Sequence, residues 1–292
     1  QEASSPTASL EAVLITSVID ALEERDVAII DIPNAFIQTR IVNDADKAVM
    51  CMRGKLAELL VSVAPDIYSK YITTNQKGEP VLYVKLLNAL YGIMKAALLF
   101  YQRFVGDLES IGFSLNPYDP CVANKIVDGT QLTIVWHVDD LKVSHKSPKT
   151  VTRMITWLKK TYERLFDDGS GAMKICRGKL HDYLGMALDF RVKGQVTIGM
   201  IPYIQEIVTL FQKYDDSIST LSTPAAEHIF RVNEESPKLS EAQGTIFHHF
   251  VAKCLFATKR LRPDIAVAVA FLTTRVKSPD QDDWKKLVRL IR

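Results

Sequence analysis

The 292-residue sequence lacks several features that would assign it to a specialised class of protein. Its four cysteines lie far apart without a C-x-x-C pair, which argues against a disulfide framework and a zinc ribbon and favours reduced thiols. The net charge of +2 is too small to indicate nucleic acid as a partner. No apolar run reaches the roughly 18 residues of a membrane span, and no secretory signal opens the chain. These absences predict an intracellular protein without a membrane segment.

What the sequence contains is ordinary globular material, 47% hydrophobic and 24% charged, enough for one large domain or two modest ones. The segment 248–292 carries ten basic and four acidic residues, and ten minus four leaves an excess of +6. Such a tail could follow a phosphate backbone, and it could equally be the solvated face of helices around a core. The first residue is not methionine, and the helical pattern 281–291 ends without a C-cap signal. We therefore expect a segment of a longer polyprotein or a degraded gene copy.

The first half of the chain combines strand and helix signals. Residues 27–32 form a short apolar run, typical of a strand buried on both faces, with Asp31 as its one carboxylate. Helical spacing of apolar residues predicts a long, core-facing helix over 88–112. A third segment, 132–145, reads as a hairpin, and a helix follows it. This order predicts an α+β sheet with helices on one side.

The hairpin prediction rests on two β-prone runs, 132–138 and 141–145, separated by Asp139 and Asp140. The two carboxylates should therefore lie at its tip. Further along, 183–190 and 195–198 predict a second hairpin.

After Pro202 the chain is predicted to turn helical, and the polar stretch 223–238 reads as a linker. Helices are expected around 248–259 and 263–276, and a capping box with an N-terminal proline at 278–281 opens the final helix. We place a domain boundary near Met200.

Asp31, Asp139 and Asp140 are candidates for metal binding. A carboxylate in a buried strand is unfavourable unless it is paired, hydrogen-bonded or bound to a cation, although Asp31 could instead cap the turn at Pro33. Asp139 and Asp140 could be an ordinary exposed tip, but the strand before them carries Trp136 on a buried face. Together the three offer the hard oxygen ligands that Mg²⁺ prefers, and two such ions support nucleotidyl transfer.

Seven short motifs follow one another along the chain. They are Asp31-Ile-Pro-Asn-Ala-Phe36, Leu90-Tyr-Gly92, Asp119-Pro-Cys121, His137-Val-Asp-Asp140, Tyr183-Leu-Gly185, Thr223-Pro224 and Arg262-Pro-Asp-Ile-Ala266. Each is weak alone, but their order is highly specific. From about residue 9 to the C-terminus, the chain resembles the reverse transcriptase region of copia-type LTR-retrotransposon polyproteins.

The resemblance implies a right-hand polymerase palm over 1–200, with its fingers largely missing. A mostly helical thumb and connecting region would follow over 201–292, truncated before ribonuclease H. The implied activity is that of an RNA-directed DNA polymerase, with Asp31, Asp139 and Asp140 holding two Mg²⁺ or Mn²⁺ ions. Implied partners are an RNA template, a DNA primer, dNTPs and other parts of the polyprotein: fingers, ribonuclease H and integrase. The implied location is a cytoplasmic virus-like particle, with a possible nuclear stage.

The resemblance also assigns residues that bind the nucleotide. Phe36 matches the steric gate, an aromatic ring under the sugar of the incoming nucleotide, whereas without the resemblance it would be an ordinary core aromatic. Tyr91 and Gly92 match the segment that leads into the template-facing helix. Just after these two residues, Met94-Lys95-Ala96-Ala97 departs from the family's commoner Lys-Gln-Ala-Pro.

Primer and duplex contacts are implied as well. Leu184 and Gly185 resemble the hairpin that positions the primer terminus, together with His137 and Val138 before the two acids. His137 stands where the family usually carries Tyr or Phe, and a protonated imidazole would compete with the metals. The candidates for binding the product duplex are Lys259, Arg260 and Arg262.

Two other functions remain open on sequence. One is a catalytically inactive, truncated remnant that binds nucleic acid through the basic tail. The other is a metal-dependent hydrolase in which His137 and Asp139 form an H-x-D pair beside Asp140 and Asp31. The hydrolase needs more histidine ligands, and the remaining histidines show no ligand spacing.

Overall fold

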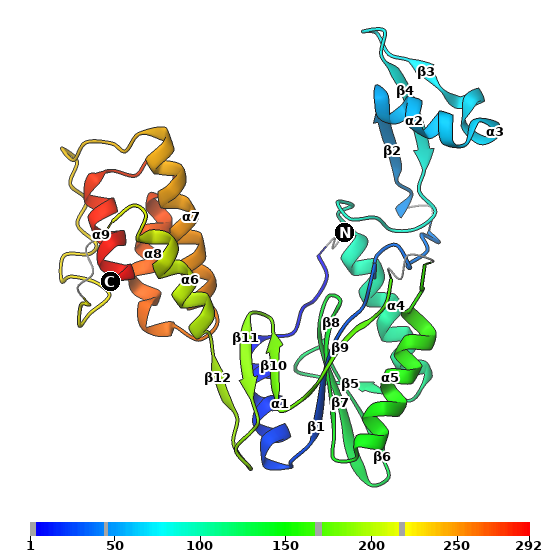
Figure 1. Ribbon diagram of the computed structural model, residues 1–292, viewed down its shortest axis with the longest axis horizontal. Coiled ribbons are helices and arrows are strands. Elements are labelled where there is room, and N and C mark those ends of the chain that lie inside the picture. The colour runs from blue at the N-terminus through cyan, green and yellow to red at the C-terminus, as the bar shows by residue number, and fades with distance from the viewer. Residues whose placement is uncertain (1–3, 44–45, 167–170, 216–219) are drawn as a thin grey trace. The chain divides into compact units, whose positions relative to one another are not determined.

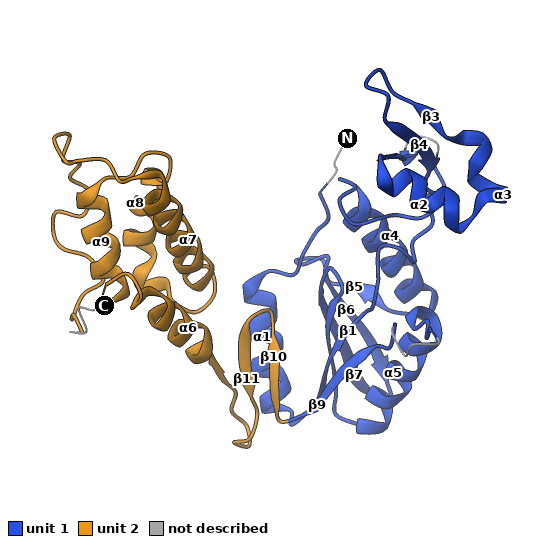
Figure 2. Ribbon diagram, turned by 45° about the horizontal axis from the view of Figure 1, so that its top comes forward, with its two compact units in different colours: residues 1–178 blue, residues 179–292 orange. Residues whose placement is uncertain are grey.

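The computed structural model describes residues 4–43, 46–166, 171–215 and 220–292. The chain divides into two compact units, unit 1 (Gln1–Gly178) and unit 2 (Lys179–Arg292), shown in different colours in Figure 2. The sequence placed a boundary near Met200 instead. The strands that follow Gly178 hydrogen-bond among themselves and not with the sheet of unit 1, so they belong to the second unit.

Unit 1 is built on a six-stranded sheet with strand order β5-β6-β7-β8-β1-β9. Every neighbouring pair in it is antiparallel. The strands are β1 (Asp26–Asp31), β5 (Ser114–Leu115), β6 (Val122–Val127), β7 (Thr130–His137), β8 (Asp140–His145) and β9 (Lys174–Gly178). The strand that carries Asp31 therefore lies inside the sheet, between β8 and β9, as its continuous apolar run predicts.

Two helices cover one face of this sheet, α4 (Ala96–Ser110) and α5 (Pro148–Tyr162), as Figure 1 shows. Side chains at alternate strand positions, such as Trp136 of β7, are buried against them. The Trp136 ring centroid lies 5.2 Å from that of Phe104 of α4. The interior of unit 1 is this layer between sheet and helices.

A third helix, α1 (Leu10–Leu22), packs on the opposite face. Lys142 lies between Leu141 and Val143 on β8, so its side chain points away from the α4 and α5 layer. Its ammonium group forms a fully buried ion pair with Asp20 of α1. The mixed α+β architecture is as predicted, but the expectation of helices on one side only is wrong because α1 covers part of the other.

The start of α1 is fixed by a residue from far along the chain. The Ser9 hydroxyl accepts a hydrogen bond from the Ala12 amide at 3.1 Å, as an N-cap does. Asp119 accepts from the Ser9 amide at 2.9 Å and from its hydroxyl at 2.8 Å, and also from the Cys121 amide at 2.9 Å. The Asp119-Pro-Cys121 motif thus has a structural task.

Helix α4 begins later than the predicted start at residue 88. Residues 91–95 are turns and irregular backbone, and Gly92 has a φ of +94°. This left-handed conformation, which glycine adopts without a steric penalty, does not occur inside an α-helix.

Between β1 and α4 the chain builds a smaller three-stranded sheet with the order β2-β4-β3. Its core is formed by Met52, Ala57 and Leu82. The elements are β2 (Val49–Arg53), α2 (Lys55–Val63), α3 (Pro65–Tyr68), a 3-10 helix (Ser69–Tyr71), β3 (Thr73–Thr74) and β4 (Pro80–Lys85). The sequence patterns described above make no prediction for this segment.

Unit 2 consists of a three-stranded sheet followed by helices. The strands are β10 (Leu180–Tyr183), β11 (Met186–Asp189) and β12 (Thr197–Gly199). The helices are α6 (Ile201–Phe211), α7 (Glu241–Thr258), α8 (Ala266–Arg275) and α9 (Gln281–Ile291), with a 3-10 turn at Pro263–Ile265. Buried apolar residues from all four α-helices form one core. Within the described ranges, every helix falls short of the length and apolarity that a membrane span requires.

Two local predictions for unit 2 need correction. The segment 183–190 is not one strand, because Leu184 and Gly185 form a turn between β10 and β11, both with positive φ. The final helix has its capping box at Asp280 and Asp283, not at Ser278, since the Asp280 carboxylate accepts hydrogen bonds from the first amides of α9.

Candidate active site

One end of the unit 1 sheet carries a row of charged and polar side chains on four neighbouring strands. The register places His137 of β7 opposite Asp140 of β8, Asp140 opposite Asp31 of β1, and Asp31 opposite Lys174 of β9. Opposite residues of antiparallel strands present their side chains on the same face, with Cβ atoms about 4.5–5.5 Å apart. The row therefore brings two of the predicted carboxylates side by side, between a histidine and a lysine.

The third carboxylate, Asp139, lies in the turn beside this row. The sequence placed Asp139 and Asp140 at the hairpin tip, but the two turn residues are Val138 and Asp139, and Asp140 is the first residue of β8. The Asp139 carbonyl accepts a hydrogen bond from the Ile32 amide at 3.0 Å, which ties the turn to the end of β1.

The turn is strained. Val138 has a φ of +61°, the positive value that tight hairpin turns require at their first central residue. A β-branched residue is disfavoured in this region by about 1–2 kcal/mol. Strain of this kind persists only where the surrounding structure holds the backbone in place, and it is found more often at functional sites.

The carboxylates disfavour one another's ionisation. Burial is the largest influence on the pKa of Asp139 and raises it. A backbone hydrogen bond lowers it, the charge of Asp31 raises it, and His137 lowers it, in decreasing order of size. Burial likewise raises the pKa of Asp140, with added contributions from Asp139 and Asp31. A group of partly desolvated acids that repel one another gains from a nearby cation.

Lys174 supplies one positive charge at this site. Its Nζ lies 3.7 Å from Oδ2 of Asp31, in a pair whose side chains are 87% and 41% exposed respectively. Sequence reasoning missed this residue. Nothing in the sequence indicates that a lysine so far along the chain joins the strand next to Asp31.

Phe36 and Tyr91 form an aromatic pair near the carboxylates. Their ring centroids are 4.6 Å apart, and Phe36 also lies 6.4 Å from Phe100 in the core. Burial raises the pKa of Tyr91, and so do the charges of Asp139 and Asp31, which shows that the phenol lies within electrostatic reach of both. The structure thus brings two of the predicted nucleotide-binding residues to the predicted metal-binding residues.

The chemistry of these donors fits a divalent cation, but their arrangement is not that of a preformed metal site. Hard carboxylate oxygens with raised pKa values suit Mg²⁺ or Mn²⁺ as ligand types. Among the residues that the structure describes, however, no group of three or more His, Cys, Asp or Glu is gathered closely enough to hold a metal ion. Asp31, Asp139 and Asp140 are neighbours that would have to turn their side chains toward a shared ion.

The predicted primer-positioning turn, Leu184 and Gly185, lies in unit 2 and contacts residues at the C-terminal end of α7. Arg260 Nε donates to the Leu184 carbonyl at 2.8 Å. The Arg260 guanidinium also stacks 3.5 Å from the ring centroid of Phe256. Gly185 lies against the same ring, where an added Cβ would be 3.0 Å from a ring carbon. Arg260 is therefore engaged in holding the turn.

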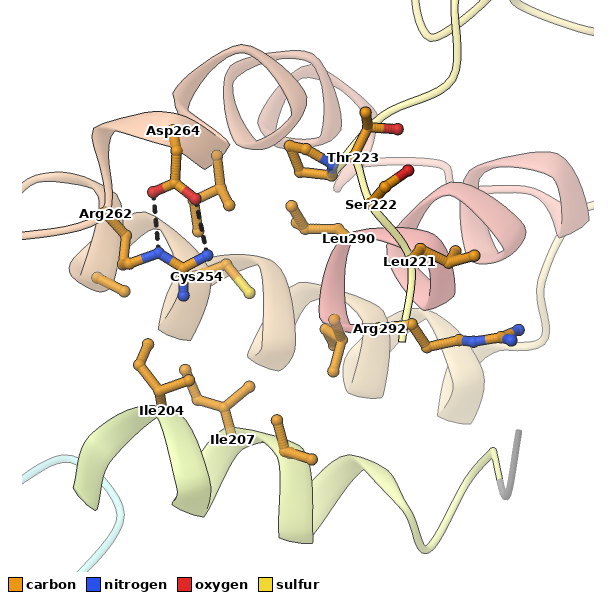
Figure 3. A pocket seen from close by; sticks show the side chains of 15 residues that line it. Ile204, Ile207, Leu221, Ser222, Thr223, Cys254, Arg262, Asp264, Leu290 and Arg292 are labelled. Carbon is orange, nitrogen blue, oxygen red and sulfur yellow. Dashed lines mark hydrogen bonds and ion pairs between the residues drawn. The ribbon is translucent and has the colours of Figure 1, made fainter. Parts of the chain in front are cut away.

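The other two predicted duplex-binding residues differ in their surroundings. Arg262 makes two hydrogen bonds to Asp264, each of 2.8 Å, at the edge of a cavity of about 260 Å³ that Cys254 and Ile204 also line (Figure 3). Lys259 is exposed. Of the three predicted cations, Lys259 is therefore the one most open to a phosphate.

Comparisons with known proteins agree with the motif order. No protein-family model matches the chain. A retrovirus-related Pol polyprotein from a transposon of tobacco, Nicotiana tabacum, is 22% identical over 257 residues, which is 86% of this chain and 18% of that protein. A putative transposon Ty5-1 protein of Saccharomyces cerevisiae is 24% identical over 208 residues, 71% of this chain and 63% of that protein.

Both relatives of this chain are transposon proteins, one of them a Pol polyprotein. The resemblance to a copia-type retrotransposon polyprotein segment is thereby confirmed. This chain spans less than two thirds of the length of either relative.

A comparison with solved structures found a telomerase from Candida tropicalis in complex with a fragment of telomeric RNA. The alignment covers 98% of this chain and 46% of the telomerase chain. Its TM-score of 0.40 and identity of 11% are too low to bear on fold or function.

Proposed function

We propose that this polyprotein segment carries the nucleotidyl-transfer site of an RNA-directed DNA polymerase. The observation that supports the proposal best is the juxtaposition of Asp31, Asp139 and Asp140, contributed by two motifs far apart in the sequence, at one end of an antiparallel sheet. In this proposal the sheet of unit 1 is the polymerase palm, and the helices of unit 2 form the thumb and connecting region.

Asp31, Asp139 and Asp140 would hold two Mg²⁺ or Mn²⁺ ions. When bound, such a pair of ions activates the attacking 3′-hydroxyl and stabilises the leaving pyrophosphate. The sheet contributes the placement of the acids: the register holds Asp31 opposite Asp140, and the bond from the Ile32 amide holds the Asp139 turn beside them. Burial raises the pKa values of Asp139 and Asp140, and neighbouring carboxylates raise them further, a repulsion that bound ions would relieve.

The aromatic pair of Phe36 and Tyr91 would contact the incoming dNTP. Phe36 is held from behind by Phe100, so its ring can act as a rigid wall under the sugar. Gly92, with its open surroundings, would let the chain approach the nucleotide closely.

The proposed nucleic-acid partners are an RNA template and a DNA primer. His137 and Val138, with Leu184 and Gly185, would position the primer end, and Lys259 would contact the duplex. Other parts of the polyprotein, namely fingers, ribonuclease H and integrase, would complete the enzyme in a cytoplasmic virus-like particle with a possible nuclear stage.

The test is primer extension on an RNA template with Mg²⁺ or Mn²⁺, using the segment joined to the upstream residues of its polyprotein. Asp139→Asn and Asp140→Asn should abolish extension. Asp66→Asn, an exposed acid on α3, is the control and should leave extension unchanged. If both site variants still extend the primer, the assignment of Asp139 and Asp140 to the catalytic site is wrong. Salt-sensitive duplex binding without any extension would point instead to an inactive nucleic-acid-binding remnant.

A further inference from the structure

Lys174 lies beside the candidate metal-binding carboxylates, although it is far from them in the sequence. It is the first residue of β9, the edge strand, and it lies directly opposite Asp31. Across the four strands the row therefore reads histidine, acid, acid, lysine. Lys174 lies on the edge strand of the sheet, whereas His137, at the other end of the row, lies on β7, which is paired with β6.

The contact between Lys174 and Asp31 is a loose one. The 3.7 Å between Nζ and Oδ2 is long for a direct hydrogen bond, and the lysine side chain is 87% exposed. A flexible four-carbon stem can carry the ammonium away from Asp31 without disturbing the sheet. The pair is thus able to open and close while β1 and β9 remain hydrogen-bonded.

We propose that Lys174 is a built-in counter-ion that competes with divalent cations for Asp31. The inference rests on the proposed metal-binding function of Asp31, Asp139 and Asp140. Without a metal, the ammonium partly neutralises a cluster of acids that repel one another. When a cation is bound to Asp31, the same ammonium faces a second positive charge at short range and is displaced into solvent. Lys174 therefore weakens cation binding and is a positioning residue, not a metal ligand.

The expected effect is modest because the pair is exposed. Exposed ion pairs stabilise by up to about 1 kcal/mol, so removing this competitor should tighten cation binding by about two- to fivefold. Screening by salt weakens interactions between exposed charges. The difference between wild type and variant should therefore shrink as ionic strength rises.

The experiment measures the affinity of the full 292-residue chain for Mn²⁺, from the electron paramagnetic resonance signal of free Mn²⁺ during titration. Lys174→Gln should lower the Kd about two- to fivefold at low salt, whereas Lys174→Arg, which keeps the charge, should leave it close to wild type. Lys149→Gln removes a charge from an exposed position on α5 and should have no effect.

Asp140→Asn separates failure of this inference from failure of the proposed function. If wild type binds Mn²⁺ and Asp140→Asn does not, the metal site stands. An unchanged Kd for Lys174→Gln would then overturn the counter-ion role alone. If Lys149→Gln tightens binding as much as Lys174→Gln, the effect is one of net charge and the role of Lys174 is refuted. Absence of saturable Mn²⁺ binding to wild type would overturn both proposals.

Discussion

Replacing Asp140 by asparagine should stabilise unit 1 when no divalent cation is present. Burial, Asp139 and Asp31 raise the pKa of Asp140 above its ordinary value. The folded chain therefore holds this proton more tightly than the unfolded chain does, and stability falls as pH rises through the raised pKa. Asparagine keeps the shape of the side chain and cannot ionise, so Asp140→Asn should remove this loss at neutral pH.

Burial is the largest cause of the raised pKa, and the part that repulsion adds can be sized from the charges involved. Carboxylates about 5 Å apart repel by about 1 kcal/mol at the dielectric constant of water, and the 41% exposure of the Asp31 side chain justifies a water-like value. In a unit of 178 residues, 1 kcal/mol corresponds to a rise in Tm of about 2–4 °C.

The assay is calorimetry of wild type and Asp140→Asn in EDTA at pH 7 and at pH 3.5. The variant should unfold at the higher temperature at pH 7, and the difference should shrink at pH 3.5, where the carboxyl is mostly protonated in both states. Added Mg²⁺ should reverse the order, because a ligand at a hundredfold excess over its Kd stabilises the wild type by about 2.7 kcal/mol. A variant less stable than wild type in EDTA at pH 7 would refute the picture of mutually repelling acids.

Three other substitutions test the surrounding framework by urea denaturation. Val138→Gly should stabilise unit 1 by up to about 1 kcal/mol by relieving the left-handed strain, and a loss of stability would argue against that strain. Gly185→Ala should destabilise unit 2 more than Gly194→Ala, since both have positive φ but only Gly185 meets a neighbouring ring; equal losses would count against the packing. Asp20→Asn should lose about 3–5 kcal/mol by leaving Lys142 buried without its partner, and a loss below 1 kcal/mol would show that the pair is hydrated.

The parts of the site that could be predicted were those defined by local patterns. The apolar run around Asp31 and the two β-prone runs around Asp139 each specify a strand by their own composition, and β1, β7 and β8 lie where those patterns placed them. The offset at the hairpin tip has a local cause as well. The sequence offers two acids as natural turn residues, but the register instead places Val138 in the turn, in a conformation that valine disfavours.

What could not be predicted depends on contacts between distant segments. β9 is an edge strand with a mixed, mostly exposed pattern, so only its pairing with β1 makes it a strand. Arg260 shows the same limit for charge. A basic residue in a basic tail resembles a phosphate ligand, and only the positions of Leu184 and Phe256 show that it is held internally. A charge pattern shows how many basic side chains a segment has, but not which of them are available to bind a phosphate.

The strand order of unit 1 has a consequence for biosynthesis. β1 precedes the other strands of the unit 1 sheet in the sequence, yet both of its hydrogen-bonding neighbours, β8 and β9, come from beyond residue 139. Until they emerge from the ribosome, an apolar strand with both edges open has no partner, and such segments are prone to aggregate. The strand that carries Asp31 therefore pairs only after nearly the whole of unit 1 has been synthesised. Chaperones that shield early apolar segments should therefore matter more for the yield of this protein than for one whose strands pair in order of synthesis.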